Sequence, residues 1–195
     1  MKSQMGIFNL IIDGAVRTRE ASCNIAEFIS ATIIRVVRST MAAESASLSQ
    51  ALDKQLYLRL VMECLLHGEP DLLGDWRKKL LIPGHLVTDA KSLYDHLTTT
   101  GSLPKERQTL VDLLCARDLF EAKVITIKWL PNRHMIADCL TKAVAPNEVY
   151  DLFIKENKFS LVPTEDQVKD EAHRLELRQG QRQRARERKN ASTMK

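Results

Sequence analysis

Apolar residues alternate with polar ones, or gather in short β-prone runs, along four stretches of the chain. GIFNLIID (6–13) and HLVTD (85–89) each have the length of a buried strand, and each ends in an aspartate. KVITIKWL (123–130) alternates most regularly. SCNIAEFISATIIRVV (22–37) is rich in β-branched residues, which is typical of a strand or a hairpin. The pattern therefore predicts β-structure in all four stretches.

A second pattern, with apolar residues three or four positions apart, predicts helices between these strands. The longest helix begins after Ser39-Thr40, which offers an N-cap, and ends near Gly68. Its apolar positions near helical spacing are Leu48, Leu52, Leu56, Met62 and Leu66. Further helices are predicted over 90–100, 105–122 and 146–157, with a short one around Asp138. This order predicts an α/β fold, with a mixed sheet and helices on its faces.

The composition narrows the class of protein. Of the 195 residues, 44% are hydrophobic and 28% are charged, as in an ordinary globular protein, and the four cysteines are scattered without a CxxC pair. Reduced thiols are therefore favoured over a disulfide framework or a zinc site. No apolar run reaches the length of a membrane span, and the N-terminal apolar stretch lacks a small-residue cleavage site. We expect a soluble intracellular protein, in the cytoplasm or the nucleus.

Charge separates the chain into two parts. The net charge is +4, and residues 163–195 hold 9 Lys and Arg against 6 Asp and Glu, so most of the basic excess lies there. We expect a domain over 1–162 and a charged, helical or partly disordered tail over 163–195. Within the tail, 174–189 carries seven basic and two acidic residues, a pattern typical of nucleic-acid binding, of nuclear import, or of a solvated extension.

Three carboxylates recur where predicted elements meet. Asp89 ends a strand, Glu44 lies in the first turn of the long helix, and Asp138 begins the helix after the last strand. Such junctions can converge at one edge of an α/β sheet, where ligands commonly bind. Each acid alone is explained by the helix dipole, but three brought together would repel one another unless a cation neutralised them. Oxygen ligands without His or Cys favour Mg²⁺ or Mn²⁺.

Three sequence blocks give these acids a context. RVVRSTMAAESASLSQALD (35–53), VTDAKSLYDHL (87–97) and IKWLPNRHMIADCLTK (127–142) each surround one of them. In order and content, the blocks resemble the ribonuclease H region at the C-terminal end of copia-type retrotransposon polyproteins, which include a reverse transcriptase. The resemblance spans about residues 25–145, with RSTMAAE and ADCLTK its most specific parts.

The resemblance implies a fold, an activity and a site. The fold is a five-stranded mixed sheet with flanking helices, and the activity is endonucleolytic cleavage of the RNA strand of an RNA–DNA hybrid. Four carboxylates hold two divalent ions, Mg²⁺ or Mn²⁺, and Glu44, Asp89 and Asp138 match three of them. Asp13, at the end of the first predicted strand, is the candidate for the fourth. The alternative is that the first strand of the family is lost and residues 1–20 are unrelated sequence.

Four further residues are candidates for contact with the nucleic acid. Arg35 and Arg38 precede Glu44 and are expected at the hybrid backbone, where basic side chains bind phosphates without reading sequence. Lys91 either touches phosphate or is a charge on the helix surface. His134 either approaches the phosphate or faces solvent in its turn.

Three hypotheses therefore stand. The first is a two-metal-ion ribonuclease that acts on RNA–DNA hybrids. The second is a catalytically inactive, nucleic-acid-binding remnant of the same fold, which gains if Asp13 lies away from the other acids. The third is an α-helical interaction protein whose acids only cap helices. It would be favoured if 85–89 and 123–130 were not adjacent strands.

Overall fold

The computed structural model describes residues 3–68, 72–99, 104–131, 134–142 and 147–162. Its strands are β1 (Gln4–Ile12), β2 (Ala21–Thr32), β3 (Gly84–Thr88), β4 (Ile125–Trp129) and β5 (Lys158–Phe159). Its α-helices are α1 (Thr40–His67), α2 (Lys91–Thr98), α3 (Arg107–Glu121) and α4 (Asn147–Glu156). Short 3₁₀ helices occupy η1 (Gly14–Arg17), η2 (Trp76–Lys79) and η4 (Ile136–Leu140). The predicted α/β class is confirmed, and the predicted tail, 163–195, lies outside the described residues.

The described strands form two separate sheets, one antiparallel and one parallel, and not the single mixed sheet that the sequence predicts. β1 and β2 make an antiparallel hairpin, and β5 adds to the far edge of β2. β3 and β4 pair in parallel, from Gly84 opposite Ile125 to Thr88 opposite Trp129. This pairing counts against the α-helical interaction protein, which would have been favoured if these two segments were not adjacent strands.

The hairpin ends earlier than its sequence suggests. The β-prone run continues to Val37, but β2 stops at Thr32, opposite Gln4 near the start of β1. Beyond Thr32 little of β1 remains to pair with, and Ile34 and Val36 are exposed instead. A run of β-branched residues forms a strand only where it has a neighbouring strand to bond with.

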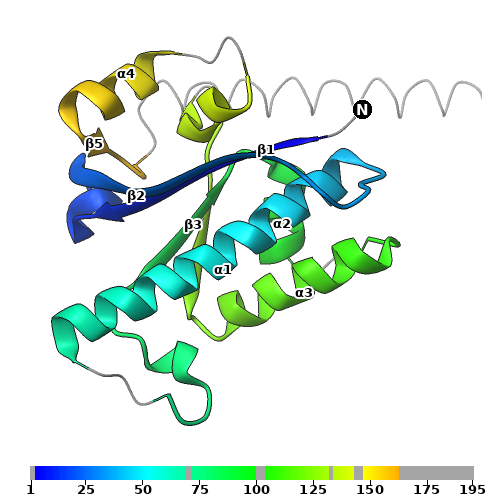
Figure 1. The fold of residues 1–195 in the computed structure, drawn as a ribbon, viewed down its shortest axis with the longest axis horizontal. Coiled ribbons are helices and arrows are strands. Elements are labelled where there is room, and N and C mark those ends of the chain that lie inside the picture. Colours follow the sequence, from blue (N-terminus) through cyan, green and yellow to red (C-terminus); the bar gives the residue numbers. More distant parts are fainter. Residues whose placement is uncertain (1–2, 69–71, 100–103, 132–133, 143–146, 163–195) are drawn as a thin grey trace, which may run out of the picture.

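Helix α1 begins and ends as predicted. The Ser39 hydroxyl accepts a hydrogen bond from the Ala42 N–H at 3.1 Å, as an N-cap does, and the helix stops at Gly68, whose φ is 88°. In Figure 1, α1 runs diagonally across the sheets, with α2 and α3 on the same side of β3. Its leucines Leu48, Leu52 and Leu56 join a core with α2, α3, β3 and β4.

The opposite face of the sheets is covered by the C-terminal elements. A second core joins residues of the hairpin with η4, α4 and β5: Val16, Ala21, Cys23, Leu130, Ile136, Phe153, Phe159 and Leu161. In Figure 1, η4 and α4 lie across the sheets from α1. The two sheets therefore sit in the middle layer of a three-layer arrangement. Among the described helices, none combines the length and the hydropathy needed to cross a membrane.

Candidate functional site: an acidic cluster at the end of strand β3

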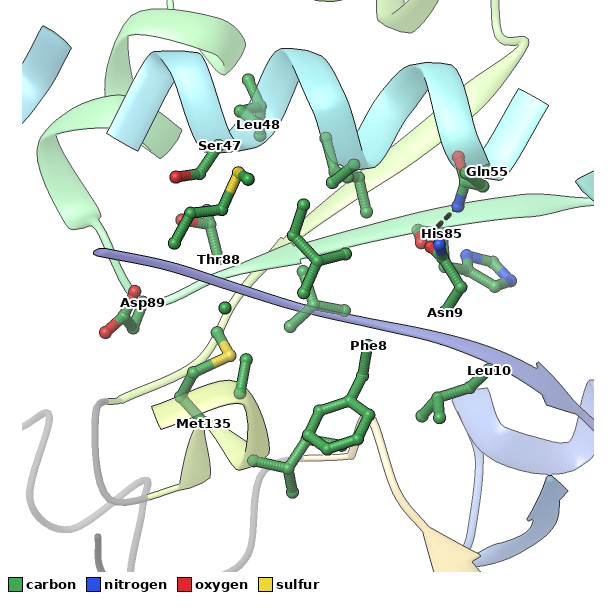
Figure 2. Close-up of a pocket in the computed structure, with 18 of the residues that line it drawn as sticks. Phe8, Asn9, Leu10, Ser47, Leu48, Gln55, His85, Thr88, Asp89 and Met135 are labelled. Atoms are coloured by element: carbon green, nitrogen blue, oxygen red, sulfur yellow. Dashed lines mark hydrogen bonds between the residues drawn. The ribbon is translucent and has the colours of Figure 1, made fainter. Parts of the chain in front are cut away.

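Glu44, Asp89 and Asp138 come together at the end of β3. Glu44 belongs to α1, Asp89 is the residue that follows β3, and Asp138 belongs to η4. The negative charges of Asp89 and Asp138 both act on Glu44, and that of Asp138 acts on Asp89. Figure 2 shows Asp89 at one end of a cavity, where β3 ends. The structure thus brings together three of the four predicted carboxylates.

Asp89 is held by the strand that precedes it. The Thr88 hydroxyl accepts a hydrogen bond from the Ala90 N–H at 3.1 Å, which turns the chain from β3 toward α2. The indole Nε1 of Trp129, at the end of β4, donates to the Asp89 carbonyl at 2.9 Å. The parallel pairing of the two strands therefore fixes the backbone of Asp89 and leaves its carboxylate to face the cluster.

The sequence pattern predicts Glu44 in the first helical turn, but the structure places it one turn later. Since α1 begins at Thr40, the first turn has no acidic residue and Glu44 lies in the second. The favourable field of a helix N-terminus fades within the first turn, so it does not account for this carboxylate. Glu44 is a partly buried acid, close enough to Asp89 and Asp138 for their charges to raise its pKa.

Asp138 is the most buried of the three, with 7% of its surface exposed. It lies in the first turn of η4, a 3₁₀ helix. Lys142 forms an ion pair with its Oδ2 at 2.6 Å, and the Lys142 N–H also donates to the Asp138 carbonyl at 2.8 Å. Lys142 is therefore a member of the site that sequence reasoning missed, although its place four residues after Asp138 in ADCLTK was a signal for it.

Burial and mutual repulsion shape the cluster. The pKa of Glu44 is raised, first by burial and then by the charges of Asp89 and Asp138, while Lys142 lowers it. The pKa of Asp89 is raised by burial and by Asp138, against smaller opposing effects of backbone hydrogen bonds and Lys142. Two neighbouring acids with raised pKa values in one cavity, Glu44 and Asp89, mark a candidate functional site.

Asp13 lies at the other end of the sheet. Near the start of β1, a Cβ on Gly6 would lie 2.7 Å from the Ala137 carbonyl oxygen, so this end of β1 lies beside Asp138. Asp13 follows the opposite end of the strand, about 20 Å further along at the usual rise per residue. It is exposed, and its Oδ1 accepts a hydrogen bond from the Ala15 N–H at 2.8 Å, capping η1. The structure does not bring Asp13 to the other acids.

The three carboxylates have the chemistry of a magnesium or manganese site, but their side chains do not converge on a single point. Glu44, Asp89 and Asp138 offer only carboxylate oxygens, the ligands that these ions prefer. Within the described part of the chain, no group of three or more His, Cys, Asp or Glu side chains lies close enough to hold an ion. Lys142 is the cation that now pairs with Asp138. Binding of a divalent ion would require side-chain rotation and release of Lys142.

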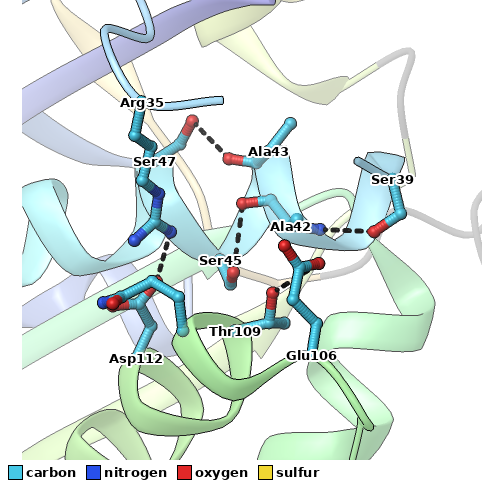
Figure 3. A network of polar contacts seen from close by, with 10 residues as sticks. Arg35, Ser39, Ala42, Ala43, Ser45, Ser47, Glu106, Thr109 and Asp112 are labelled. Atoms are coloured by element: carbon cyan, nitrogen blue, oxygen red, sulfur yellow. Dashed lines mark hydrogen bonds and ion pairs between the residues drawn. The ribbon is translucent and has the colours of Figure 1, made fainter. Parts of the chain in front are cut away.

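The four candidate nucleic-acid contacts have different surroundings. Arg35 forms an ion pair with Asp112 of α3, whose side chain is 7% exposed (Figure 3). Arg38 is exposed, and His134 is partly buried and lines the cavity. Lys91 pairs with Asp95 at 3.1 Å and lies 5.1 Å from the ring centre of Trp129. Arg35 therefore has a structural partner, whereas Arg38 is available at the surface.

Comparison of the chain with protein-family models, with curated proteins and with solved structures finds no match.

The raised pKa values predict how stability depends on pH. Glu44 and Asp89 titrate above their ordinary values of 4.5 and 3.8, so they favour the folded state below those values and lose that contribution as pH rises through the raised pKa values. Asp89→Asn removes one of the repelling charges. We expect the variant to melt at a higher temperature than the wild type at about pH 7, with the gap closing by about pH 3.5.

Thermal unfolding followed by circular dichroism checks this expectation. Asp53→Asn, which changes an exposed acid of α1, is the matched control. An equal gain of melting temperature for Asp89→Asn at both pH values would show that charge repulsion is not its cause.

The Arg35–Asp112 pair makes a second prediction. Arg35→Ala leaves the buried Asp112 carboxylate without its cation, so we expect a loss of about 1–3 kcal/mol in the free energy of unfolding. Arg38→Ala, three residues away and exposed, should change it by less than about 0.5 kcal/mol. Urea denaturation of the two variants measures the difference, and equal values would mean that the ion pair adds nothing to stability.

Proposed function

We propose that the chain is a ribonuclease H-like domain related to copia-type retrotransposon polyproteins, and that its acidic cluster holds divalent ions for cleavage of the RNA strand in RNA–DNA hybrids. The observation that carries the proposal is the convergence of Glu44, Asp89 and Asp138. The three sequence blocks that resemble the family contribute one of these acids each.

The local arrangement supports this proposal over a set of helix caps. Glu44 lies beyond the first turn of α1, and Asp89 precedes α2 without any side-chain cap to that helix. Burial, and then mutual repulsion, raise the pKa values of Glu44 and Asp89, which supports a role for a cation beside their charged forms. Mg²⁺ or Mn²⁺ would relieve the repulsion, and a pair of such ions supplies an activated water and neutralises the leaving oxygen in phosphodiester hydrolysis.

The residues of this chain would have separate tasks. Glu44, Asp89 and Asp138 would hold the ions, and Lys142 would move from Asp138 toward a phosphate oxygen once the ions took its place. Arg38, which is exposed near the start of α1, would bind the backbone of the hybrid. The RNA strand would be distinguished by its 2′-hydroxyl groups.

The position of Asp13 favours a second candidate. With Asp13 at the far end of β1, the cluster has three of the four carboxylates that the family uses. A three-carboxylate site would hold one of two ions weakly. The second candidate is therefore a domain that binds RNA–DNA hybrids without cleaving them.

Cleavage of an end-labelled RNA–DNA hybrid in Mg²⁺ or Mn²⁺ tests the proposed function. We expect the wild type to cut the RNA strand, and we expect Asp89→Asn and Glu44→Gln each to lower the rate at least about 100-fold, or about 2.7 kcal/mol in the barrier. Asp53→Asn, which changes an exposed acid on the same helix as Glu44, should cleave like the wild type.

Binding to the same hybrid, measured without metal, separates the two candidates. A folded protein that binds the hybrid but does not cut it supports the non-cleaving domain. Absence of both binding and cleavage contradicts both candidates. In either candidate Arg38→Ala should weaken binding and reduce its salt dependence.

A further inference from the structure

The two sheets face each other along strand edges that have no neighbour among the described residues. β1 is the outer strand of its sheet and β3 is an outer strand of the other, and no ladder joins them. Between them lies a cavity of about 1100 Å³, lined by every residue of β1 and by His85, Leu86, Val87 and Thr88 of β3. Figure 2 shows β1 crossing this cavity beside β3, with side chains of α1 on one side of it. The volume lies slightly above the range of ordinary ligand pockets, about 300–1,000 Å³.

Hydrogen bonds on the paired sides identify the free groups on the other sides. The Leu130 N–H donates to the Thr88 carbonyl at 2.9 Å, so Thr88 faces β4 and the backbone groups of His85 and Val87 point away from it. On β1, the Ser3 carbonyl accepts from Ile33 and the Asp13 N–H donates to Ser22, so odd-numbered residues face β2. The N–H and C=O groups of Gly6, Phe8 and Leu10 therefore point to the unpaired edge of β1.

A side chain already substitutes for a strand at one of these groups. Gln55 of α1 donates from Nε2 to the His85 carbonyl at 2.6 Å, on the open edge of β3 (Figure 2). Its other polar atom, Oε1, is buried without a hydrogen-bond partner in the described structure. A buried hydrogen-bond acceptor without a donor lowers the stability of the fold. Gln55 Oε1 therefore marks a position on the open edge of β3 where an N–H donor is missing.

The two edges also belong to the same layer. On β1, Met5 and Ile7 pack with Ala46 of α1, while Phe8 and Leu10 join the core on the opposite face. On β3, Leu86 packs in the core with α1 and Val87 in the opposite core. One more strand between β1 and β3 would therefore be covered on both faces, as a central strand of apolar sequence is.

We propose that the cavity is a slot for one extended strand of a separate polypeptide, which pairs with β1 and β3 and joins the two sheets into one. The strand runs antiparallel to β1 and parallel to β3, which themselves run in opposite directions. This orientation gives the longer edge, nine residues in β1 against five in β3, the more stable antiparallel pairing.

The charges at the two ends of the slot determine which residue types fit at each end of the bound strand. At the start of β3, Arg17 donates from Nε to His85 at 3.3 Å, and the Arg59 guanidinium lies against Gly84. At the end of β3 lies the acidic cluster. The bound strand is therefore apolar in its middle and acidic at its N-terminal end, and its C-terminal end reaches Asp89.

A fluorescein-labelled peptide, Glu-Glu-Gly-Val-Ile-Val-Thr-Val-Asn-Gly-amide, tests the slot on the full chain. Fluorescence anisotropy should show saturable binding, and amide hydrogen exchange should slow at Phe8 and Val87. A peptide with proline in place of the central valine lacks one ladder N–H, and we expect it to bind at least tenfold more weakly. Equal binding of the two peptides, or no binding, would overturn the proposal.

Two variants locate the binding on the protein. Val87→Pro removes an N–H that points into the slot and spares the hydrogen bonds to β4, so it should weaken peptide binding at least tenfold. Val87→Ala keeps the N–H and should bind the peptide nearly as the wild type does. Melting curves verify that both variants are folded. If the free chain is instead a dimer that the peptide dissociates, the occupant is a second copy and the proposal is wrong.

A peptide with aspartate in place of the asparagine connects the slot to the proposed function, and this arm alone rests on it. Its carboxylate would lie beside Glu44, Asp89 and Asp138, so it should bind more weakly than the asparagine peptide without metal and at least tenfold more tightly with Mg²⁺ than without. If only the asparagine peptide binds and Mg²⁺ has no effect, the result supports the strand slot and contradicts the metal site. If neither peptide binds but Mg²⁺ still supports hybrid cleavage, the slot fails and the proposed function stands.

Discussion

Packing against helix α1 is the interaction on which the rest of the structure depends. No hydrogen-bonded ladder joins the two sheets in the part of the chain that the structure describes, yet each sheet packs on this helix. Leu48, Leu52 and Leu56 pack with β3 and β4, and Ala46 packs with the hairpin. Because its apolar side chains spread around much of its circumference, α1 can serve both sheets at once. It also carries Glu44, so the helix that joins the sheets also positions one carboxylate of the acidic cluster.

The acidic cluster opposes the stability of this arrangement. Burial and repulsion raise the pKa values of Glu44 and Asp89, and Lys142 offsets only part of the charge. Carboxylates held together at a cost to stability are characteristic of sites whose purpose is binding or catalysis. The open edges of β1 and β3 have the same character, since a protein whose only requirement was stability would pair or cover them.

Local features of the sequence predicted much of this fold, and non-local ones account for what was missed. The Ser39 cap, the Gly68 stop and the strand 125–129 depend on neighbouring residues, and the pattern located them closely. The end of β2 at Thr32 depends on where β1 begins, and the distance of Asp13 from the cluster depends on the direction of β1 relative to β3. Neither relation can be predicted from the pattern of neighbouring residues in the sequence. Lys142 was missed because its role appears only once Asp138 is known to be buried.

The most direct test of the central claim is a titration of the full chain with Mn²⁺, followed by the loss of the free-ion signal in electron paramagnetic resonance. If Glu44, Asp89 and Asp138 form a divalent-ion site, the wild type should bind Mn²⁺ saturably and Asp138→Asn should bind it at least about tenfold more weakly, or about 1.4 kcal/mol. Asp53→Asn should bind as the wild type does. Equal binding by the wild type and Asp138→Asn, or no binding by either, would contradict the assignment of the cluster as a metal site.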